Sequence, residues 1–360
     1  MRAGGTPSSM TRSLLPLAAL LALGSPVMAQ EETAPPSPNQ IVEEAAREEW
    51  VAIAPEDLLV MTLAPAADGT EREVVIQLMP APFSQGWVEN IRTLARAGWY
   101  DGITVNRVQD NYVVQWGDPN YDNPEAEGEA KPLPEGLRVM GDDEYLATSP
   151  LRDILAPGQW DNISVVPEPI DALLALPSGD VHGRHGFGDG WPLAFMDRER
   201  KRSETRQIWP IHCYGMVGVG RGYSPDTGSG AELYTVIGHA PRHLDRNIAL
   251  VGRVVEGMEH LSSLPRGSGA LGFYTAEEAD KRTPILSVRV ASDLPEGDPA
   301  SGGEAVGQQT RPAFEFLSTE SETFARYADA RANRRDPFFI HPAGGADICN
   351  IPVPVRRVAD

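Results

Sequence analysis

Two polar side chains stand within a pair of closely spaced apolar segments. Arg107 lies in residues 105–108 (Val-Asn-Arg-Val), and Gln115 lies in residues 113–118 (Val-Val-Gln-Trp-Gly-Asp). The β-branched and aromatic residues of both segments are typical of buried strands. Burying a guanidinium costs free energy unless the group has a partner. Arg107 is therefore either a structural residue held by a carboxylate such as Asp118 or part of a binding site.

The pattern around Arg107 predicts a strand, a helix and then two strand segments that carry the polar pair. Residues 74–78 are predicted as a strand, 84–97 as an amphipathic helix that ends at Gly98, and 103–108 and 112–115 as further strands. One stripe of the helix holds its apolar residues, which are Trp87, Ile91, Leu94 and Ala95. The polar pair is thus expected on adjacent strands of a β-rich domain.

The motifs along the chain resemble those of cyclophilin-type peptidyl-prolyl cis/trans isomerases. The family's first helix carries a Glu-Asn pair and a glycine before Tyr-Asp-Gly, similar to Glu89-Asn90 and residues 98–102. Its Phe-His-Arg-Val and Phe-Met-Val-Gln-Gly-Gly-Asp motifs are similar to residues 105–108 and 112–118. Downstream, Leu-Ser-Met-Ala-Asn-Ala-Gly, Gly-Ser-Gln-Phe-Phe and Val-Phe-Gly-Arg-Val-Val-Glu-Gly-Met resemble residues 214–220, 230–234 and 250–258. Several matches in the family's order are more specific than any one.

The resemblance implies a mainly β fold, a closed antiparallel cyclophilin-like barrel capped by two helices, and isomerase activity on proline-containing peptide segments. It implies that Arg107 donates to the twisting prolyl amide and that Gln115 binds the substrate backbone. The residues that it places around the substrate are Tyr112, Val113, Val217, Gly218, Tyr234, His243, Leu244 and Ile248. Backbone around Gly218 would pair with the peptide. Rotation of an amide needs no nucleophile, so neither a cofactor nor a metal is implied.

The chain departs from the family pattern mainly in this pocket. Asn106 replaces histidine, Tyr112 replaces phenylalanine, Val217-Gly218 replaces Ala-Asn, His243 replaces an aromatic residue, and Ile248 stands where many members carry histidine. Arg107 and Gln115 are retained. We expect an isomerase with altered peptide preference; the alternative is a catalytically weak or inactive peptide-binding chaperone or scaffold.

The overall charge argues against a nucleic-acid partner. The 360 residues carry a formal charge of −20 at pH 7, whereas binding to a phosphate backbone depends on clustered lysine and arginine. The length exceeds that of a minimal barrel, so additions to one main domain are expected.

The N-terminus has the pattern of a secretory signal. Arg12 precedes an apolar run over residues 14–23, and Val27-Met28-Ala29 forms a small-residue cleavage site before Gln30. The run is too short for a stable membrane span. We expect an exported protein, which in a bacterium means the periplasm.

Composition suggests the organisation of the remaining chain. Residues 30–48 are rich in Glu, Pro and Ala and are predicted to be a disordered leader. The predicted parts are a signal peptide (1–29), the leader (30–48), the barrel (49–294) with a loop insertion at 119–211, a linker (295–310), and a C-terminal helix and extended tail (311–360). A capping pattern at residues 319–322 marks the start of the C-terminal helix.

The remaining candidates for chemistry are two cysteines and a histidine loop. Cys213 and Cys349 are either two buried thiols or a disulfide that ties the tail to the core. His182 and His185 have a spacing compatible with zinc, which leaves a hydrolase as a third hypothesis. No cysteine lies beside them, so the interpretation is a solvated loop without metal.

Overall fold

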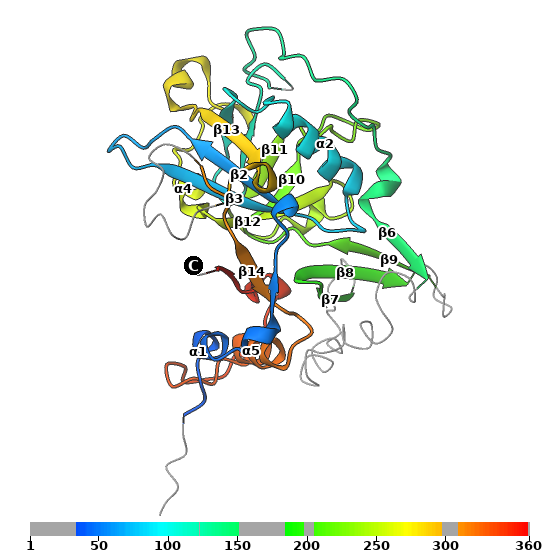
Figure 1. The fold of residues 1–360 in the computed structure, drawn as a ribbon, viewed down its shortest axis with the longest axis vertical. Helices are drawn as coiled ribbons and strands as arrows, with labels where there is room; N and C mark the ends of the chain where they lie inside the picture. The colour runs from blue at the N-terminus through cyan, green and yellow to red at the C-terminus, as the bar shows by residue number, and fades with distance from the viewer. Residues whose placement is uncertain (1–33, 122, 151–183, 198–204, 297–308, 359–360) are drawn as a thin grey trace, which may run out of the picture. The chain divides into compact units, whose positions relative to one another are not determined.

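The main element of the fold is an eight-stranded antiparallel sheet (Figure 1). A computed structural model describes residues 34–121, 123–150, 184–197, 205–296 and 309–358. The strand order is β13-β2-β3-β12-β10-β11-β5-β4. In chain order these strands are β2 (Leu58–Leu63), β3 (Arg72–Leu78), β4 (Thr104–Val108), β5 (Val113–Gly117), β10 (Met216–Val219), β11 (Leu233–Val236), β12 (Leu250–Glu256) and β13 (Ile285–Val290).

The two outer strands of this sheet, β4 and β13, come together and nearly close a barrel. The Gly102 amide donates to the Ile285 carbonyl over 2.9 Å, and the Ile285 amide donates to the Ile103 carbonyl over 2.8 Å. The Val105 amide also bonds the Thr283 carbonyl over 2.9 Å. The predicted mainly β barrel is therefore present, although this seam is shorter than a full ladder.

Helix α2 (Gln85–Arg96) buries its apolar stripe against the barrel. Trp87, Ile91 and Leu94 are fully buried, and each such side chain contributes about 1.5–3 kcal/mol of hydrophobic free energy. Gly98 follows the helix with φ of +63°, a conformation that favours glycine. The predicted helix and its glycine end are confirmed. A short helix, α4 (Met258–Ser262), follows β12.

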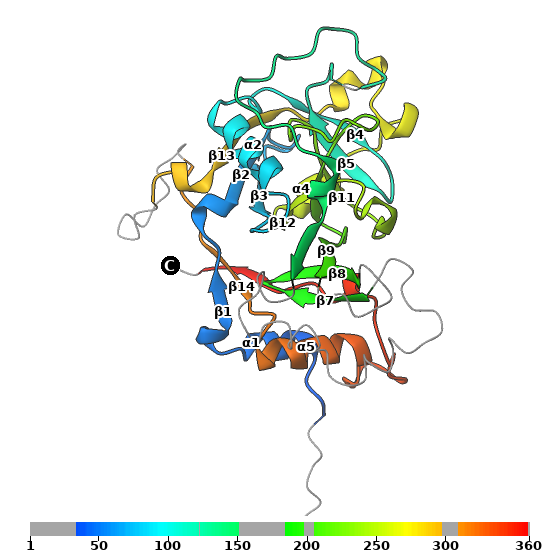
Figure 2. The ribbon, with the colours of Figure 1, turned by 90° about the vertical axis from the view of Figure 1, so that its right-hand side faces the viewer.

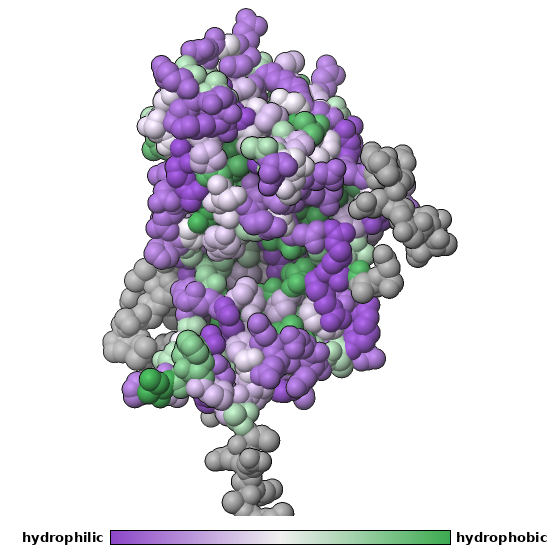
Figure 3. Space-filling view, turned by 90° about the vertical axis from the view of Figure 1, so that its left-hand side faces the viewer, coloured by the Kyte–Doolittle hydropathy of each residue, from purple (hydrophilic) through white to green (hydrophobic). Residues whose placement is uncertain are grey.

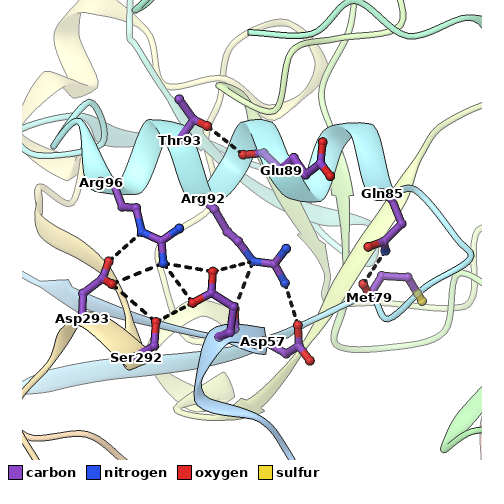
Figure 4. Close-up of polar contacts among 10 residues, drawn as sticks. Asp57, Met79, Gln85, Glu89, Arg92, Thr93, Arg96, Ser292 and Asp293 are labelled. Carbon is purple, nitrogen blue, oxygen red and sulfur yellow. Dashed lines mark hydrogen bonds and ion pairs between the residues drawn. The ribbon is translucent and has the colours of Figure 1, made fainter. Parts of the chain in front are cut away.

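The outer face of α2 is held by ion pairs (Figure 4). Arg92 Nη2 lies 2.6 Å from Asp57 Oδ1, and Arg96 bonds both Glu56 and Asp293 over 2.9 Å. Glu56 and Asp57 belong to the 3₁₀ turn η2 (Pro55–Asp57) before β2, and Asp293 belongs to η7 (Ala291–Asp293) after β13. These contacts attach the helix to the ends of neighbouring strands. Such exposed pairs contribute little individually.

The segment between β5 and β10 contains a second, four-stranded sheet of order β6-β9-β8-β7. Its strands are β6 (Ala147–Pro150), β7 (Arg184–Gly188), β8 (Trp191–Asp197) and β9 (Thr205–Pro210). The described part of the predicted loop insertion at 119–211 thus contains a sheet as well as loops. Asp189 and Gly190, both at positive φ, form the β7-β8 turn, because a two-residue hairpin needs this conformation. That 119–211 is an insertion stays a prediction.

The predicted disordered leader at 30–48 is wrong for its described end. Ser37 begins helix α1 (Pro38–Glu43), and its backbone amide and side chain exchange hydrogen bonds with Gln40. Ile41 is buried and α1 packs beside α5 (Figure 2). The Glu, Pro and Ala composition of the segment gave no indication of this capping box or of the burial of Ile41. Residues 1–33, including the predicted signal, lie outside the described ranges.

The C-terminal part contains a helix where the sequence placed one. Ser321 Oγ accepts from the Phe324 amide at the start of α5 (Glu322–Asn333). The predicted extended tail continues into β15 (Val355–Arg357), which pairs with β14 (Phe314–Leu317), and β14 pairs with β1 (Trp50–Ala52). Of the predicted linker, residues 297–308 lie outside the described ranges.

Cys213 and Cys349 form a disulfide with a Cα–Cα distance of 5.1 Å. The structure thus selects the cross-link over the two free thiols that the sequence left open. The bond ties η8 (Ile348–Asn350) of the tail to the segment just before β10. It closes a loop with a sequence separation of 136 residues, which in the chain-entropy model restricts the unfolded chain.

One face of the molecule shows the hydropathy of its surface. Figure 3 shows a mostly hydrophilic face on which apolar side chains gather only in small patches. None of the helices within the described ranges combines the length and apolar character needed to cross a membrane. Those ranges also contain no group of three His, Cys, Asp or Glu side chains that could hold a metal ion.

Candidate functional site

Strand register places the polar pair in one row on the sheet. Arg107 on β4 is opposite Gln115 on β5, Gln115 is opposite Tyr234 on β11, and Tyr234 is opposite Gly218 on β10. Because side chains alternate along a strand, Val114 and Trp116 belong to the barrel core while Gln115 faces the other side. Sequence positions that are far apart thus share one face.

Arg107 is half-buried and has no hydrogen bond to Asp118. Its Nε donates to the Leu271 carbonyl over 2.7 Å, Nη1 donates to Gln115 Oε1 over 3.1 Å, and Nη2 donates to Gln109 Oε1. The Asp118 carboxylate accepts backbone hydrogen bonds from residues 120 and 131 instead. The hypothesis of a structural arginine held by Asp118 is therefore wrong.

The Arg107 guanidinium borders a pocket of about 760 Å³. Its lining includes an apolar cluster formed by Tyr112, Val113, Tyr234, Leu244 and Ile248. The lining also includes polar side chains, among them Asn120, Asn123, Arg221 and Glu232. Arginine has five N–H donors, and the three hydrogen bonds above use three of them. The guanidinium is positioned to donate to a ligand in the pocket.

Burial shapes the electrostatics of this pocket. It lowers the pKa of Arg107 from its ordinary value, and it raises the pKa of Tyr112 and, further, that of Tyr234. Both phenols are therefore neutral at physiological pH, and Arg107 keeps its charge because the ordinary pKa of an arginine lies far above physiological pH. The rings of Tyr112 and Phe273 lie 5.6 and 5.5 Å from its guanidinium carbon, which favours the cation.

Three of the predicted substrate-binding residues do not line the pocket. Val217 is buried in the core, and Gly218 lies on β10, which pairs with β11 on one side and β12 on the other. Backbone at Gly218 is thus engaged in the sheet, contrary to the prediction that it pairs with a peptide. His243 is exposed and stacks on Tyr112 with 6.0 Å between ring centroids. It supports the pocket wall from outside.

The sequence departure at Asn106 has a structural explanation. Its Nδ2 donates to the Gly117 carbonyl over 3.0 Å, and its Oδ1 accepts from Thr104 Oγ1 over 2.5 Å. The side chain is buried and joins β4 to β5. This replacement therefore leaves the pocket surface unchanged.

Other pocket residues were missed by sequence reasoning. Leu271 and Phe273 form the wall beside Arg107. The backbones of Arg107 and Phe273 form an isolated antiparallel β-bridge. They lie on an irregular segment that includes η5 (Ala270–Gly272), where no periodic pattern gave a signal. Gly220, Arg221 and Tyr223 also line the pocket. Gly220 ends the matched motif over residues 214–220 and the other two residues follow it, which was the only usable hint.

The histidine hypothesis has no support in the described residues. His185 lies on β7 within the second sheet and takes no part in the pocket around Arg107. His182 lies outside the described residues. Within the described ranges, the hydrolase interpretation therefore has no cluster of metal-binding side chains to support it.

Comparisons with known proteins agree with this geometry. The sequence matches the family model described as cyclophilin type peptidyl-prolyl cis-trans isomerase/CLD over residues 70–290. A crystal structure of a cyclophilin from Hirschia baltica is similar, with a TM-score of 0.59, 21% identity, and coverage of 87% of this chain and 98% of that chain. No curated protein matches the sequence. The family match spans every predicted site residue from Arg107 to Ile248.

Two weaker structural similarities involve another organism. They are crystal structures of a cyclophilin type peptidyl-prolyl cis-trans isomerase from Cryptosporidium parvum, one of them in the presence of the dipeptide Ala-Pro. Their TM-scores are 0.33 and 0.34 at 10% and 11% identity. They cover 65% and 68% of this chain and 97% and 99% of their own.

Proposed function

The chain belongs to the cyclophilin-type peptidyl-prolyl cis-trans isomerase family, and on this premise we propose that it catalyses rotation about X-Pro bonds in unfolded or newly exported protein chains. The observation that carries the proposal is the Arg107 guanidinium, which borders an open pocket while its hydrogen bonds go to neutral oxygens. A cation that no carboxylate neutralises can stabilise the electron density that develops on the substrate amide during rotation.

The reaction asks for little covalent chemistry. Resonance gives the X-Pro bond partial double-bond character, with a barrier of roughly 18–20 kcal/mol. When the amide twists, the prolyl nitrogen becomes pyramidal and gains a lone pair that can accept a hydrogen bond. A donor that meets this lone pair stabilises the twisted state more than the planar one, and only such a difference accelerates the reaction. Arg107 is the donor in our proposal.

The apolar cluster in the pocket lining suits the prolyl ring. Val113, Leu244 and Ile248 supply aliphatic surface packed with Tyr234. A pyrrolidine ring placed there would present its nitrogen toward the Arg107 side. The bound ring would be held while the preceding carbonyl rotates.

Gln115 links the cation to the substrate backbone. Its Oε1 accepts from Arg107, so the amide is oriented with Nε2 toward Gly220, where a β-carbon would lie 3.4 Å from this nitrogen. An Nε2 group at the pocket wall can donate to a substrate carbonyl. We therefore assign Gln115 two tasks: it fixes the guanidinium and it holds the peptide.

Replacing Arg107 tests the proposal. We expect Arg107→Ala to lower kcat/KM for cis-to-trans conversion of a proline tetrapeptide about 10²–10³-fold, the size typical of a lost transition-state donor. Arg96→Ala is the matched control, because Arg96 lies on the outer face of α2. Equal and slow rates for wild type and Arg107→Ala would instead indicate a non-catalytic peptide-binding chaperone or scaffold.

We also propose that the protein is exported after cleavage before Gln30. The apolar run at residues 14–23 supports this, and so does the Cys213–Cys349 disulfide, because such bonds persist in oxidising compartments. Mass spectrometry of the protein from fractionated native cells would detect the mature N-terminus. An intact residue 1 in the cytosolic fraction would contradict export.

A further inference from the structure

A buried polar chain lies behind the floor of the pocket. Tyr234 Oη lies 3.0 Å from His212 Nε2, and His212 Nδ1 lies 2.9 Å from Asp245 Oδ1. The other carboxylate oxygen of Asp245 accepts from Arg242 Nε over 2.7 Å. His212 and Asp245 are 1% and 2% exposed. Four consecutive polar groups in the interior are costly unless each has a partner.

The hydrogen bonds of Asp245 determine which groups donate and which accept along this row of side chains. Its Oδ1 also accepts from the His212 backbone amide over 3.0 Å. Burial opposes its ionisation, but the hydrogen bonds from His212 and Arg242 outweigh this and lower the pKa of the carboxyl. An ionised carboxylate only accepts, so Nδ1–H donates to Asp245, and in the neutral imidazole Nε2 accepts from the Tyr234 hydroxyl. The imidazole tautomer is thereby set, and with it the rotation of the phenol.

The sheet provides room for the phenol only because residue 218 is glycine. A β-carbon at Gly218 would lie 2.4 Å from both Cζ and Oη of Tyr234. The hydroxyl end of the ring therefore lies directly over the β10 backbone, where His212 reaches it. The rings of Tyr234 and His212 are nearly parallel, with an interplanar angle of 14°. The β10 backbone beside the ring and the hydrogen bond between its hydroxyl and His212 hold the ring in one place.

Asp245 also fixes the pocket wall. It follows the 3₁₀ turn η4 (Arg242–Leu244), whose last residue, Leu244, lines the pocket. The carboxylate bonds both His212 and Arg242, so it ties this turn to the segment before β10. One buried group therefore connects the floor at Tyr234 with the wall at Leu244.

We propose that His212 and Asp245 are positioning residues that hold Tyr234 and Leu244 at a separation matched to the five-membered prolyl ring. The inference rests on the proposed function, because it concerns the ring selectivity of the same pocket. Without the hydrogen bonds among Tyr234, His212 and Asp245, Tyr234 and Leu244 can move apart and accept a larger ring at a smaller cost in binding free energy. The effect appears in substrate binding, whereas Arg107 acts on the rotation step.

The test compares peptides that contain proline with the same peptides containing pipecolic acid, which has a six-membered ring. We expect His212→Phe to raise KM for the prolyl peptide about tenfold, with kcat within about threefold. The preference in kcat/KM for proline over pipecolic acid should fall about fivefold. His212→Gln can accept from Tyr234 and donate to Asp245, so it should restore most of both values.

A pair of hydroxyl deletions on β11 provides the matched control. Tyr234→Phe removes the group that bonds His212, and we expect it to reproduce the loss of ring selectivity. Thr235→Val removes a neighbouring buried hydroxyl for which the described residues supply no hydrogen-bond partner, and it should change neither KM nor selectivity. The double variant His212→Phe/Tyr234→Phe should be no worse than His212→Phe alone, because the hydrogen bond to Tyr234 is already lost in that variant.

Several outcomes would overturn the inference. Unchanged ring selectivity in His212→Phe and Tyr234→Phe would do so, as would additive effects or a loss confined to kcat. If His212→Phe does not fold, Tyr234→Phe alone decides. A wild-type protein that binds the prolyl peptide in an NMR titration but does not accelerate its isomerisation would refute the proposed function, and the Kd values for the two rings would still decide the inference.

Discussion

Arg107, which is half-buried, and Arg253, which is buried, lie in strands of the same barrel and have different surroundings. Each is directly opposite a glutamine on the next strand, Gln115 for Arg107 and Gln77 for Arg253, and each bonds that glutamine's Oε1. Arg107 borders the 760 Å³ pocket. Arg253 is only 7% exposed, donates to the Gly190 carbonyl, and lies 4.5 Å from the centroid of the Trp191 ring.

The difference shows that a buried arginine in a strand is not by itself a sign of a site. Burial lowers the pKa of Arg253 to about 9, so it still carries its charge at neutral pH. The ring faces near Arg253 and the Gln77 and Gly190 oxygens offset the cost of burial. At Arg107 the remaining donors meet a pocket that can accept a ligand. Arg253 borders only a smaller cavity of about 270 Å³, so the size of the neighbouring space separates the two residues.

The largest expected effect comes from replacing the two arginines in parallel. Arg107→Met should lower kcat/KM about 10²–10³-fold and change the free energy of unfolding by less than about 1 kcal/mol. Arg253→Met should destabilise the fold by about 1–3 kcal/mol, because Gln77 and Gly190 lose their donor, while the folded protein keeps its activity. Denaturant unfolding and initial rates measure both. The comparison fails if the folded Arg253→Met protein is inactive or if Arg107→Met keeps full turnover.

A smaller effect is expected from the two glutamines. Gln115→Leu should lower kcat/KM about tenfold, because Arg107 loses a neighbour that orients it. Gln77→Leu should leave kcat/KM unchanged and destabilise the protein by about 1–2 kcal/mol, since Arg253 Nε is left without an acceptor. The same two assays apply. Equal catalytic losses in both variants would remove the distinction between the two pairs.

The smallest expected effect is a pH-dependent change in melting temperature caused by Glu278, which bonds the loop beside Arg107. Glu278 accepts from Lys281 and from the Ser268 and Thr275 amides, which lowers its pKa from 4.5 to about 2. A depressed folded-state pKa means that this contribution to stability is present above pH 4.5 and is lost as the pH falls toward 2. Glu278→Gln should therefore lower the melting temperature slightly at pH 7 and not at pH 2.

The segment that Glu278 bonds carries Leu271 and Phe273 of the pocket wall. Wild-type kcat/KM should thus be insensitive to this carboxyl between pH 5 and 7. A melting-temperature difference between wild type and Glu278→Gln that persists unchanged at pH 2 would contradict the assignment.

The sequence predicted the parts of the site that local pattern encodes. Arg107, Gln115 and Tyr112 lie in short motifs whose strand alternation fixes the face of each side chain, and the helix before them has a clear apolar stripe. The wall at Leu271 and Phe273 could not be predicted in this way. Arg107 Nε contacts this wall at the Leu271 backbone carbonyl, 164 positions away in the sequence. A backbone atom has no residue-type signature that the sequence could show.

The errors of sequence reasoning have similar causes. The leader helix α1 depends on a capping box and one buried isoleucine, features too small to outweigh a Glu, Pro and Ala composition. His212 stands in an apolar stretch where a single histidine has no distinctive pattern, and its partners Tyr234 and Asp245 are distant in sequence. Gly218 matched a motif position, but its role is to admit the Tyr234 ring.

The central claim is that Arg107 accelerates rotation rather than simply binding peptide, and NMR exchange spectroscopy of one prolyl peptide tests it most directly. The spectra give the cis-trans exchange rate and the bound fraction in the same sample. We predict that wild type accelerates exchange and that Arg107→Ala binds the peptide within about threefold of the wild-type Kd without accelerating it. Exchange that is equally fast with Arg107→Ala would contradict the account.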